Sequence, residues 1–199
     1  MRIIVLSKAP VVGKVKTRLM PQYTAEQAAS LQKKMTRSVL TKVCSAYDDV
    51  WLAVDDVNHR FFQGLETSGL NIELHDQGQG SLGERLQKLT TASFATDQQP
   101  VLLIGTDSPH VHMSRYQHAE YVLEKYDVVI GPVEDGGYDF IALSADYPDV
   151  FAGIDWSSST VFSQTLTNIS NLALTSKALD LSFDLDHAED IDRAPPHTW

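Results

Sequence analysis

Cysteine is almost absent from this chain of 199 residues, which contains only Cys44. A single thiol excludes an internal disulfide and is typical of a protein in a reducing compartment, so we expect a cytoplasmic location. Cys44 lies within an amphipathic helical pattern, which favours a packing role over that of a nucleophile.

Long apolar runs are also missing. No stretch approaches the roughly 18 residues that a membrane helix needs. The apolar segment Ile3–Leu6 is too short for the core of a signal peptide. The sequence therefore predicts neither a membrane span nor a secretion signal.

Positive charge is scarce, with 16 Lys and Arg residues against 26 Asp and Glu residues and a formal net charge of -10. General nucleic-acid binding requires a broad basic face, so this balance argues against a nucleic-acid partner. The hydrophobic content of 43% is ordinary for a soluble globular protein. The length suits one domain spanning residues 1–199.

Several common catalytic motifs are absent. No Gly-x-Gly-x-x-Gly follows the first apolar segment, which leaves a dinucleotide site unsupported. The stretch Gly13–Thr17 lacks the leading glycine and the Gly-Lys-Ser/Thr run of a P-loop. A serine hydrolase is improbable because no Gly-x-Ser-x-Gly elbow is present.

The chain does contain a regular alternation of strand and helix patterns. Strands are expected over 1–7, 50–54, 71–75, 100–105, 127–131 and 138–143, with short strands near 172–174 and 182–185. Helices are expected over 24–46, 58–67, 81–95, 116–125 and 159–168, with a final helix from Asp186. Capping boxes at Thr24 and Ser81 mark two helix starts. This alternation predicts a three-layer α/β sandwich with a mostly parallel sheet.

Active sites in such sheets lie beyond the carboxyl ends of the strands. That rule selects the loops 8–18, 76–83, 105–112, 131–138 and 184–187. Every unusual polar motif of the chain falls in one of these loops, which indicates an enzyme.

The loop after the first strand is unusually basic for an acidic protein. It carries Lys8, Lys14, Lys16 and Arg18. Such a cluster repels itself unless an anion neutralises it, and the usual anion at this edge of an α/β sheet is a phosphate. The alternative is a solvated basic loop without a ligand.

Two carboxylates suit a divalent cation. Asp107 follows the most apolar strand, and Asp186 ends the motif Phe183-Asp-Leu-Asp186, with Asp184 as the second choice. Mg²⁺ and Mn²⁺ prefer oxygen ligands from one or two carboxylates together with substrate phosphates. Alternatively, Asp107 caps a turn and Asp186 caps the last helix.

Three further segments carry weaker signals. Asp135, in Gly131-Pro-Val-Glu-Asp-Gly-Gly-Tyr138, is a candidate to accept substrate hydroxyls or to act as a general base, although a plain turn explains the motif as well. Ser157 precedes a helix, where it binds an anion or only caps the helix. A metal held by His110 and His112 is less favoured, because imidazole suits softer ions.

Taken together, these motifs are similar to those of a known family. The segments are Lys8–Leu19, Gly80–Arg85, Gly105–Pro109, Gly131–Tyr138, Trp156-Ser157 and Asp184–Asp186. In this order they resemble small bacterial glycosyltransferase-like proteins of the DUF2064 type, in the nucleotide-diphospho-sugar transferase superfamily with the GT-A fold. The loop Lys14–Leu19 is also similar to that of 2-phospholactate guanylyltransferases.

The resemblance implies a nucleotide over the first strand and Mg²⁺ or Mn²⁺ on Asp107, with Asp186 as a second ligand. Asp107 and Asp135 are the expected catalytic residues. The expected nucleotide-binding residues are Lys8, Gly13, Lys14, Lys16, Arg18, Gly80 and Ser157.

The expected activity is metal-dependent glycosyl transfer from a nucleoside diphosphate sugar to a small-molecule acceptor. The first alternative is a nucleotidyltransferase, which joins a nucleoside triphosphate to a phosphorylated or sugar acceptor and releases pyrophosphate. The second is a non-catalytic nucleotide-binding module. The sequence leaves the acceptor, the donor base and the oligomeric state open.

Overall fold

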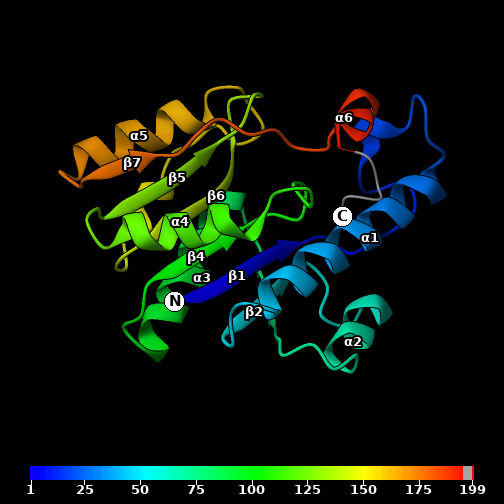
Figure 1. Ribbon diagram of the computed structural model, residues 1–199, viewed down its shortest axis with the longest axis horizontal. Coiled ribbons are helices and arrows are strands. Elements are labelled where there is room, and N and C mark those ends of the chain that lie inside the picture. Colours follow the sequence, from blue (N-terminus) through cyan, green and yellow to red (C-terminus); the bar gives the residue numbers. More distant parts are fainter. Residues whose placement is uncertain (195–198) are drawn as a thin grey trace.

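The computed structural model describes residues 1–194 and residue 199 of the chain (Figure 1). Its strands are β1 (Arg2–Ser7), β2 (Val50–Val54), β3 (Glu73–Asp76), β4 (Val101–Ile104), β5 (Val128–Pro132), β6 (Tyr138–Leu143) and β7 (Ser176–Ala178). Its helices are α1 (Ala25–Cys44), α2 (Arg60–Glu66), α3 (Leu82–Thr96), α4 (Met113–Leu123), α5 (Val161–Asn171) and α6 (Ala188–Arg193). Short 3-10 helices are η1 (Thr17–Leu19) and η2 (Pro148–Phe151).

The strands form one sheet in the order β3-β2-β1-β4-β6-β5-β7. All neighbouring strands are parallel except that β6 runs antiparallel to both β4 and β5. The predicted fold class, an α/β protein with a mostly parallel sheet, is confirmed. Within the described residues no helix combines the length and apolar character needed to cross a membrane.

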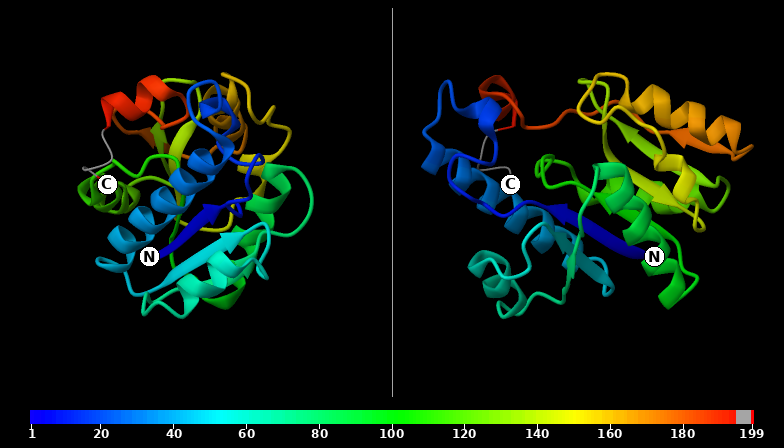
Figure 2. Two further views of the ribbon diagram at one scale, coloured as in Figure 1. Left: turned by 90° about the vertical axis from the view of Figure 1, so that its right-hand side faces the viewer. Right: turned by 180° about the vertical axis from the view of Figure 1, so that it is seen from behind.

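Helices cover both faces of this sheet (Figures 1 and 2). On one face, α1, α2 and α4 pack against inward residues of the strands such as Ile3 and Val5. On the other, α3, η2 and α5 pack against Ile4 and its neighbours. Successive side chains of a strand point to opposite faces, so a strand buried on both sides needs an uninterrupted apolar run. The central strands are therefore continuous apolar segments in the sequence.

Both predicted capping boxes are present. The Thr24 hydroxyl accepts from the Gln27 backbone N–H at 3.3 Å, and the Gln27 side chain accepts from the Thr24 backbone at 2.7 Å. Ser81 and Glu84 make the same reciprocal pair at the start of α3. These boxes fix where the loops before α1 and α3 end.

The expectation of strands at 172–174 and 182–185 is wrong. Helix α5 extends to Asn171, and Ala173 turns the chain with a φ of 55°, so the edge strand begins only at Ser176. Beyond β7 the chain leaves the sheet, and of the segment 182–185 only Ser182 forms an isolated bridge, to Val133. The last helix begins at Ala188 rather than at Asp186, with His187 as its N-cap.

A third apolar cluster holds the end of the described chain beside the first loop. It contains Leu19 of η1, Met35 of α1, and Leu185, Ile191 and Ala194 from the last segment. In Figures 1 and 2 the red α6 accordingly lies against the blue loop that precedes α1. This packing carries residues 184–187 across the carboxyl edge of the sheet to the basic loop.

Candidate functional site

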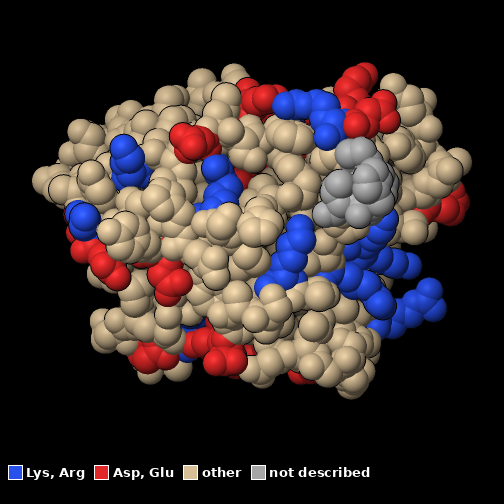
Figure 3. Space-filling model, in the orientation of Figure 1, with Lys and Arg blue, Asp and Glu red and all other residues tan. Residues whose placement is uncertain are grey.

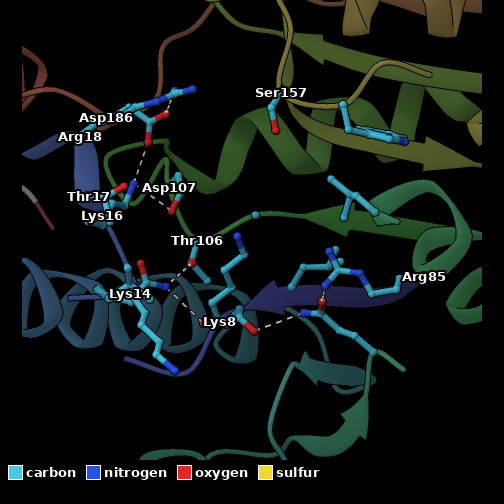
Figure 4. Close-up of a pocket in the computed structure, with 18 residues that line it drawn as sticks. Lys8, Lys14, Lys16, Thr17, Arg18, Arg85, Thr106, Asp107, Ser157 and Asp186 are labelled. Carbon is cyan, nitrogen blue, oxygen red and sulfur yellow. Dashed lines mark hydrogen bonds and ion pairs between the residues drawn. The ribbon is translucent and has the colours of Figure 1, made fainter. Parts of the chain in front are cut away.

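A cavity of about 440 Å³ lies at the carboxyl ends of β1 and β4 (Figure 4). Its walls come from the loop after β1, from α1, from the start of α3, and from the loops after β4, η2 and β7. The lining residues are Leu6, Ser7, Lys8, Lys14, Val15, Lys16, Thr17, Arg18, Gln32, Gln77, Leu82, Arg85, Gly105, Thr106, Asp107, Trp156, Ser157 and Asp186. Five of these carry a positive charge and two a negative charge, in a chain whose net charge is -10.

Lys16 lies between the two carboxylates of this cavity. Its Nζ is 3.0 Å from Asp107 Oδ1, 3.0 Å from Asp186 Oδ1 and 2.8 Å from the Leu185 carbonyl oxygen. Only 5% of the Lys16 side chain is exposed. Burial disfavours the ammonium, but the two carboxylates outweigh burial and raise the pKa of Lys16 above its ordinary value. Lys16 therefore stays charged.

Asp186 is neutralised from a second side by Arg18, whose Nη1 is 2.8 Å from Asp186 Oδ2. Burial raises the pKa of the Asp186 carboxyl, but Lys16 and Arg18 outweigh burial and hold that pKa below its ordinary value. The Asp107 side chain is 47% exposed and that of Asp186 26% exposed. Asp186 therefore favours its ionised form, and both carboxylates line the cavity.

Contacts of Leu185 explain why Asp107 and Asp186 lie close together. Leu185 is fully buried in the third apolar cluster, and its backbone N–H donates to the Asp107 carbonyl at 2.8 Å. This hydrogen bond ties the segment containing Asp186 directly to the loop after β4. The carboxylates of Asp107 and Asp186 are therefore held close together by backbone and core contacts.

Lys8 and Lys14 line the same cavity from the loop after β1. Both are exposed, and neither has an ion-pair partner within residues 1–194 and 199. Figure 4 shows both side chains below Lys16 and Asp107. These two ammonium groups are available to an anionic ligand, whereas Lys16 and Arg18 already hold carboxylates.

Gln77 and Arg85 form an opposite wall that the sequence patterns did not single out. The Gln77 amide donates to the carbonyls of Ser7 and Ala53 at 3.2 and 2.8 Å, and its oxygen accepts from Arg85 Nη1 at 2.5 Å. The Nε of Arg85 is buried and has no partner among the described residues. Arg85 is the last residue of the motif Gly80–Arg85, and this position in the motif is the sequence signal that could have identified it as a site residue.

Asp184, the second choice for a metal ligand, does not line the cavity. Its carboxyl accepts a hydrogen bond from the Ser108 hydroxyl. Burial raises the pKa of Asp184 to about 7, with the Ser108 hydrogen bond opposing the shift and the neighbouring carboxylates adding to it. Of the two candidates, Asp186 is the one that faces the cavity.

The raised pKa of Asp184 predicts a pH-dependent loss of stability. The unfolded carboxyl ionises near pH 4, whereas the folded one keeps its proton until about pH 7. Between these values the wild-type protein therefore loses stability as the pH rises, by up to roughly 1.4 kcal/mol for each unit of pH. Asp184→Asn cannot ionise, so its free energy of unfolding relative to wild type should rise from pH 4 to pH 7 and then level off.

Urea unfolding at several pH values in metal-free buffer measures this difference. Asp146→Asn is a matched control, because Asp146 is exposed and lies outside the cavity. A constant difference between Asp184→Asn and wild type across this range would show that Asp184 is ionised in the folded protein at low pH.

Asp135, Gly13 and Gly80 do not line the cavity. The Asp135 carboxylate is exposed and accepts from the Gly137 N–H at 2.9 Å, as in a plain turn. This turn packs against the first turn of α5, where the Phe162 N–H donates to the Gly136 carbonyl. The catalytic role of Asp135 stays a prediction without support from the shape of the cavity.

The remaining predicted positions have distinct placements. Ser157 lines the cavity and has a left-handed backbone with a φ of 76°. Lys16 is also left-handed, at 48°. His110 stacks on Phe183 outside the cavity, and burial lowers its pKa to about 4. His112 accepts from the Ser114 N–H and caps α4.

A second cleft of about 680 Å³ lies on the other side of the basic loop. It is lined by Pro10, Val11, Val12, Lys33, Arg37, His59, Arg60 and Phe61. Figure 3 shows basic side chains gathered on this side of the molecule, around α1 and α2. None of the residues lining this cleft is acidic, so it offers no carboxylate to a divalent cation.

The residues of the first cavity fit a hard divalent ion. Asp107 and Asp186 supply two carboxylates, and the neighbouring cations would hold a phosphate that completes the coordination. No group of three or more His, Cys, Asp or Glu side chains among the described residues is arranged to hold a metal alone. The donor set therefore suits Mg²⁺ or Mn²⁺ bound together with a phosphorylated ligand.

Comparison with known proteins places the chain in a family. A family model described as "Uncharacterized protein conserved in bacteria (DUF2064)" matches residues 36–158. The chain belongs to this family. No curated protein matches the sequence of this DUF2064 member.

Solved structures with the same fold are numerous. A protein from Desulfovibrio desulfuricans G20, provisionally described as a nucleotide-diphospho-sugar transferase, is 25% identical with a TM-score of 0.85, and the match covers 99% of this chain and 93% of that one. CMP:2-keto-3-deoxy-manno-octonic acid synthetase complexed with CTP is 10% identical with a TM-score of 0.63, over 96% and 95%. Rv0371c from Mycobacterium tuberculosis H37Rv, complexed with manganese, is 14% identical with a TM-score of 0.55, over 98% and 97%. The fold is that of the nucleotide-diphospho-sugar transferases.

Proposed function

We propose that this DUF2064 member is a transferase that uses a nucleotide-activated donor. The observation that carries the proposal is the convergence of Lys8, Lys14, Lys16 and Arg18 with Asp107 and Asp186 in one cavity. A polyphosphate would supply the negatively charged partner that Lys8 and Lys14 lack. Of the three non-glycine residues with a left-handed backbone in the described part of the chain, Lys16 and Ser157 line this cavity, and such backbone strain concentrates at functional sites.

The donor that we favour is a nucleoside diphosphate sugar. The Desulfovibrio protein described in those terms is 25% identical to this chain, and the match covers 99% of the chain. In the transfer, an acceptor hydroxyl oxygen bonds to the anomeric carbon while the bond from that carbon to the diphosphate breaks. The diphosphate leaves with the electron pair, and the hydroxyl proton passes to a base.

The residues of the cavity stabilise the leaving group. Lys8 and Lys14 would bind the phosphates and offset the charge that develops on them. Asp107 and Asp186 would hold Mg²⁺ or Mn²⁺, which supplies Lewis-acid stabilisation of that charge when bound. No covalent nucleophile is required, so positioning and electrostatics account for the rate.

Nucleotidyl transfer is the second candidate, favoured by two specific observations. The cavity holds five cationic side chains, enough for a triphosphate, and the synthetase with the same fold is complexed with CTP. In that reaction an acceptor oxygen bonds to the α-phosphorus and pyrophosphate leaves. Product analysis by phosphorus NMR separates the two, because glycosyl transfer releases a nucleoside diphosphate and nucleotidyl transfer releases pyrophosphate.

A thermal-shift panel of nucleotides and nucleotide sugars, with and without Mg²⁺ or Mn²⁺, tests the proposal as a whole. A ligand at a hundredfold excess over its Kd adds about 2.7 kcal/mol of stability. For a domain of this size, that corresponds to a rise of roughly 5–10 °C in Tm. We expect such a rise for at least one nucleotide with a divalent ion. A panel without any shift would contradict the proposal, and a shift independent of metal and without turnover would favour a non-catalytic binding module.

A further inference from the structure

We propose that the Lys16 ammonium competes with the divalent cation for Asp107 and Asp186. Lys16 pairs with both carboxylates until a bound polyphosphate attracts it away from them. The proposal rests on the proposed function in one respect, since it takes these two carboxylates as the metal ligands. It goes further by assigning Lys16 a role distinct from those of Lys8 and Lys14.

Lys16 occupies the space between the two carboxylates. Lys16 Nζ lies 3.0 Å from one oxygen of each carboxylate. Lys16 lies between these two oxygens, and the other oxygen of Asp186, Oδ2, is held by Arg18. A divalent ion that bridges the two carboxylates at about 2.0–2.6 Å therefore has to enter the space that the ammonium fills. Two cations cannot both lie against these oxygens without strong repulsion. Binding of the ion therefore requires the Lys16 ammonium to move.

The hydrogen-bond donors of the Lys16 ammonium are already fully satisfied. An ammonium has three N–H donors. The structure provides three acceptors, which are Asp107 Oδ1, Asp186 Oδ1 and the Leu185 carbonyl. Lys16 can bind a phosphate only by giving up one of these partners. Lys8 and Lys14 have no such partners to lose among the described residues.

The charges of the site also favour coupled binding of the metal and the polyphosphate. Asp107 and Asp186 carry two negative charges, and Lys16 and Arg18, which pair with them, carry two positive charges. A divalent ion approaching the ligand-free protein therefore meets a neutral group of four charges, and the other charged residues of the cavity, Lys8, Lys14 and Arg85, repel it. A bound polyphosphate adds negative charge and gives the ammonium a new partner. Metal and polyphosphate binding should accordingly strengthen each other.

The test measures Mn²⁺ binding to the full chain, by the EPR signal of free Mn²⁺, in the absence of any nucleotide. Lys16→Gln removes the charge but keeps an amide donor, and it should bind Mn²⁺ about ten- to a hundredfold more tightly than wild type, the usual range of coupling between two sites. Lys16→Arg keeps the charge and should bind as weakly as wild type. Lys14→Gln, with the same charge change in the same cavity but no contact with the carboxylates, should have a much smaller effect.

The possible outcomes separate this proposal from the proposed function. Equal Mn²⁺ affinity in Lys16→Gln and Lys14→Gln would overturn the competition but leave the metal site intact. If Lys16→Gln gains affinity and the added change Asp186→Asn abolishes the gain, both ideas are supported. If no variant binds Mn²⁺, with or without a nucleotide, both fail.

Should Lys16→Gln not fold, wild-type protein labelled with ¹⁵N-lysine gives the answer. A buried ammonium with three acceptors produces a slowly exchanging signal, which the Lys16→Arg variant identifies by its loss. Mg²⁺ that saturates the site should abolish this signal in the wild-type protein. A signal unchanged by bound Mg²⁺ would overturn the proposal.

Discussion

Replacing Asp107 by asparagine is expected to lower metal-stimulated turnover by about a thousandfold, while the protein remains folded. The loss of one preorganised charged group from a transferase site has an effect of this order. Asp107 supplies one of two carboxylates at the cavity mouth, and its side chain is 47% exposed. The substitution therefore removes the carboxylate that we propose as a metal ligand, without opening a cavity in the core.

Turnover with saturating Mg²⁺, together with the unfolding temperature, measures this effect. Asp146→Asn makes the same chemical change on an exposed residue outside the cavity and should retain wild-type activity. Full activity in Asp107→Asn would refute the assignment of this carboxylate.

The double variant Lys8→Met/Lys14→Met is expected to lower the affinity for the nucleotide by about a thousandfold. A hydrogen bond to a charged group contributes about 1.5–3 kcal/mol, and each of these lysines is available for one. Neither forms an ion pair within the described part of the chain, so their loss leaves no carboxylate unpaired. The stability of the protein should accordingly change little.

Calorimetric titration of the nucleotide selected by the thermal-shift panel measures the affinity. The control is Lys33→Met/Arg37→Met, which removes the same charge from the second cleft. A purely general effect of net charge would weaken binding equally in both double variants. Equal losses would therefore show that Lys8 and Lys14 make no specific contact with the phosphates.

The fold could be predicted from local patterns because its main determinants are local. Continuous apolar strands, helix periodicity and the capping boxes at Thr24 and Ser81 depend on neighbouring residues alone. The antiparallel insertion of β6 between β4 and β5 depends on how distant segments pair, and a single sequence does not encode that pairing in its periodicity. The segment 182–185 has a strand-like pattern for another reason, because Leu185 points into the third apolar cluster.

Most residues of the site could be predicted from the sequence, but the contacts between them could not. The rule for strand ends in α/β sheets selected the loops that carry Lys14, Asp107 and Asp186, and all three residues line the cavity. The ion pair between Lys16 and Asp186 joins residues 170 positions apart. It forms because apolar packing brings the last segment back to the first loop. No local pattern reveals such an encounter. Gln77 and Arg85 are only 8 positions apart, but Gln77 is held in the cavity wall by the carbonyls of Ser7 and Ala53, which are 70 and 24 positions away.

The central claim is that the basic loop and the two carboxylates share one polyphosphate. Diffraction from crystals grown with a nucleoside diphosphate and Mn²⁺, recorded at the manganese absorption edge, tests it most directly. We expect phosphate density beside Lys8 and Lys14 and an anomalous peak within bonding distance of Asp107 and Asp186. Nucleotide bound instead in the second cleft beside Lys33 and Arg37, with no anomalous peak at these carboxylates, would contradict the account.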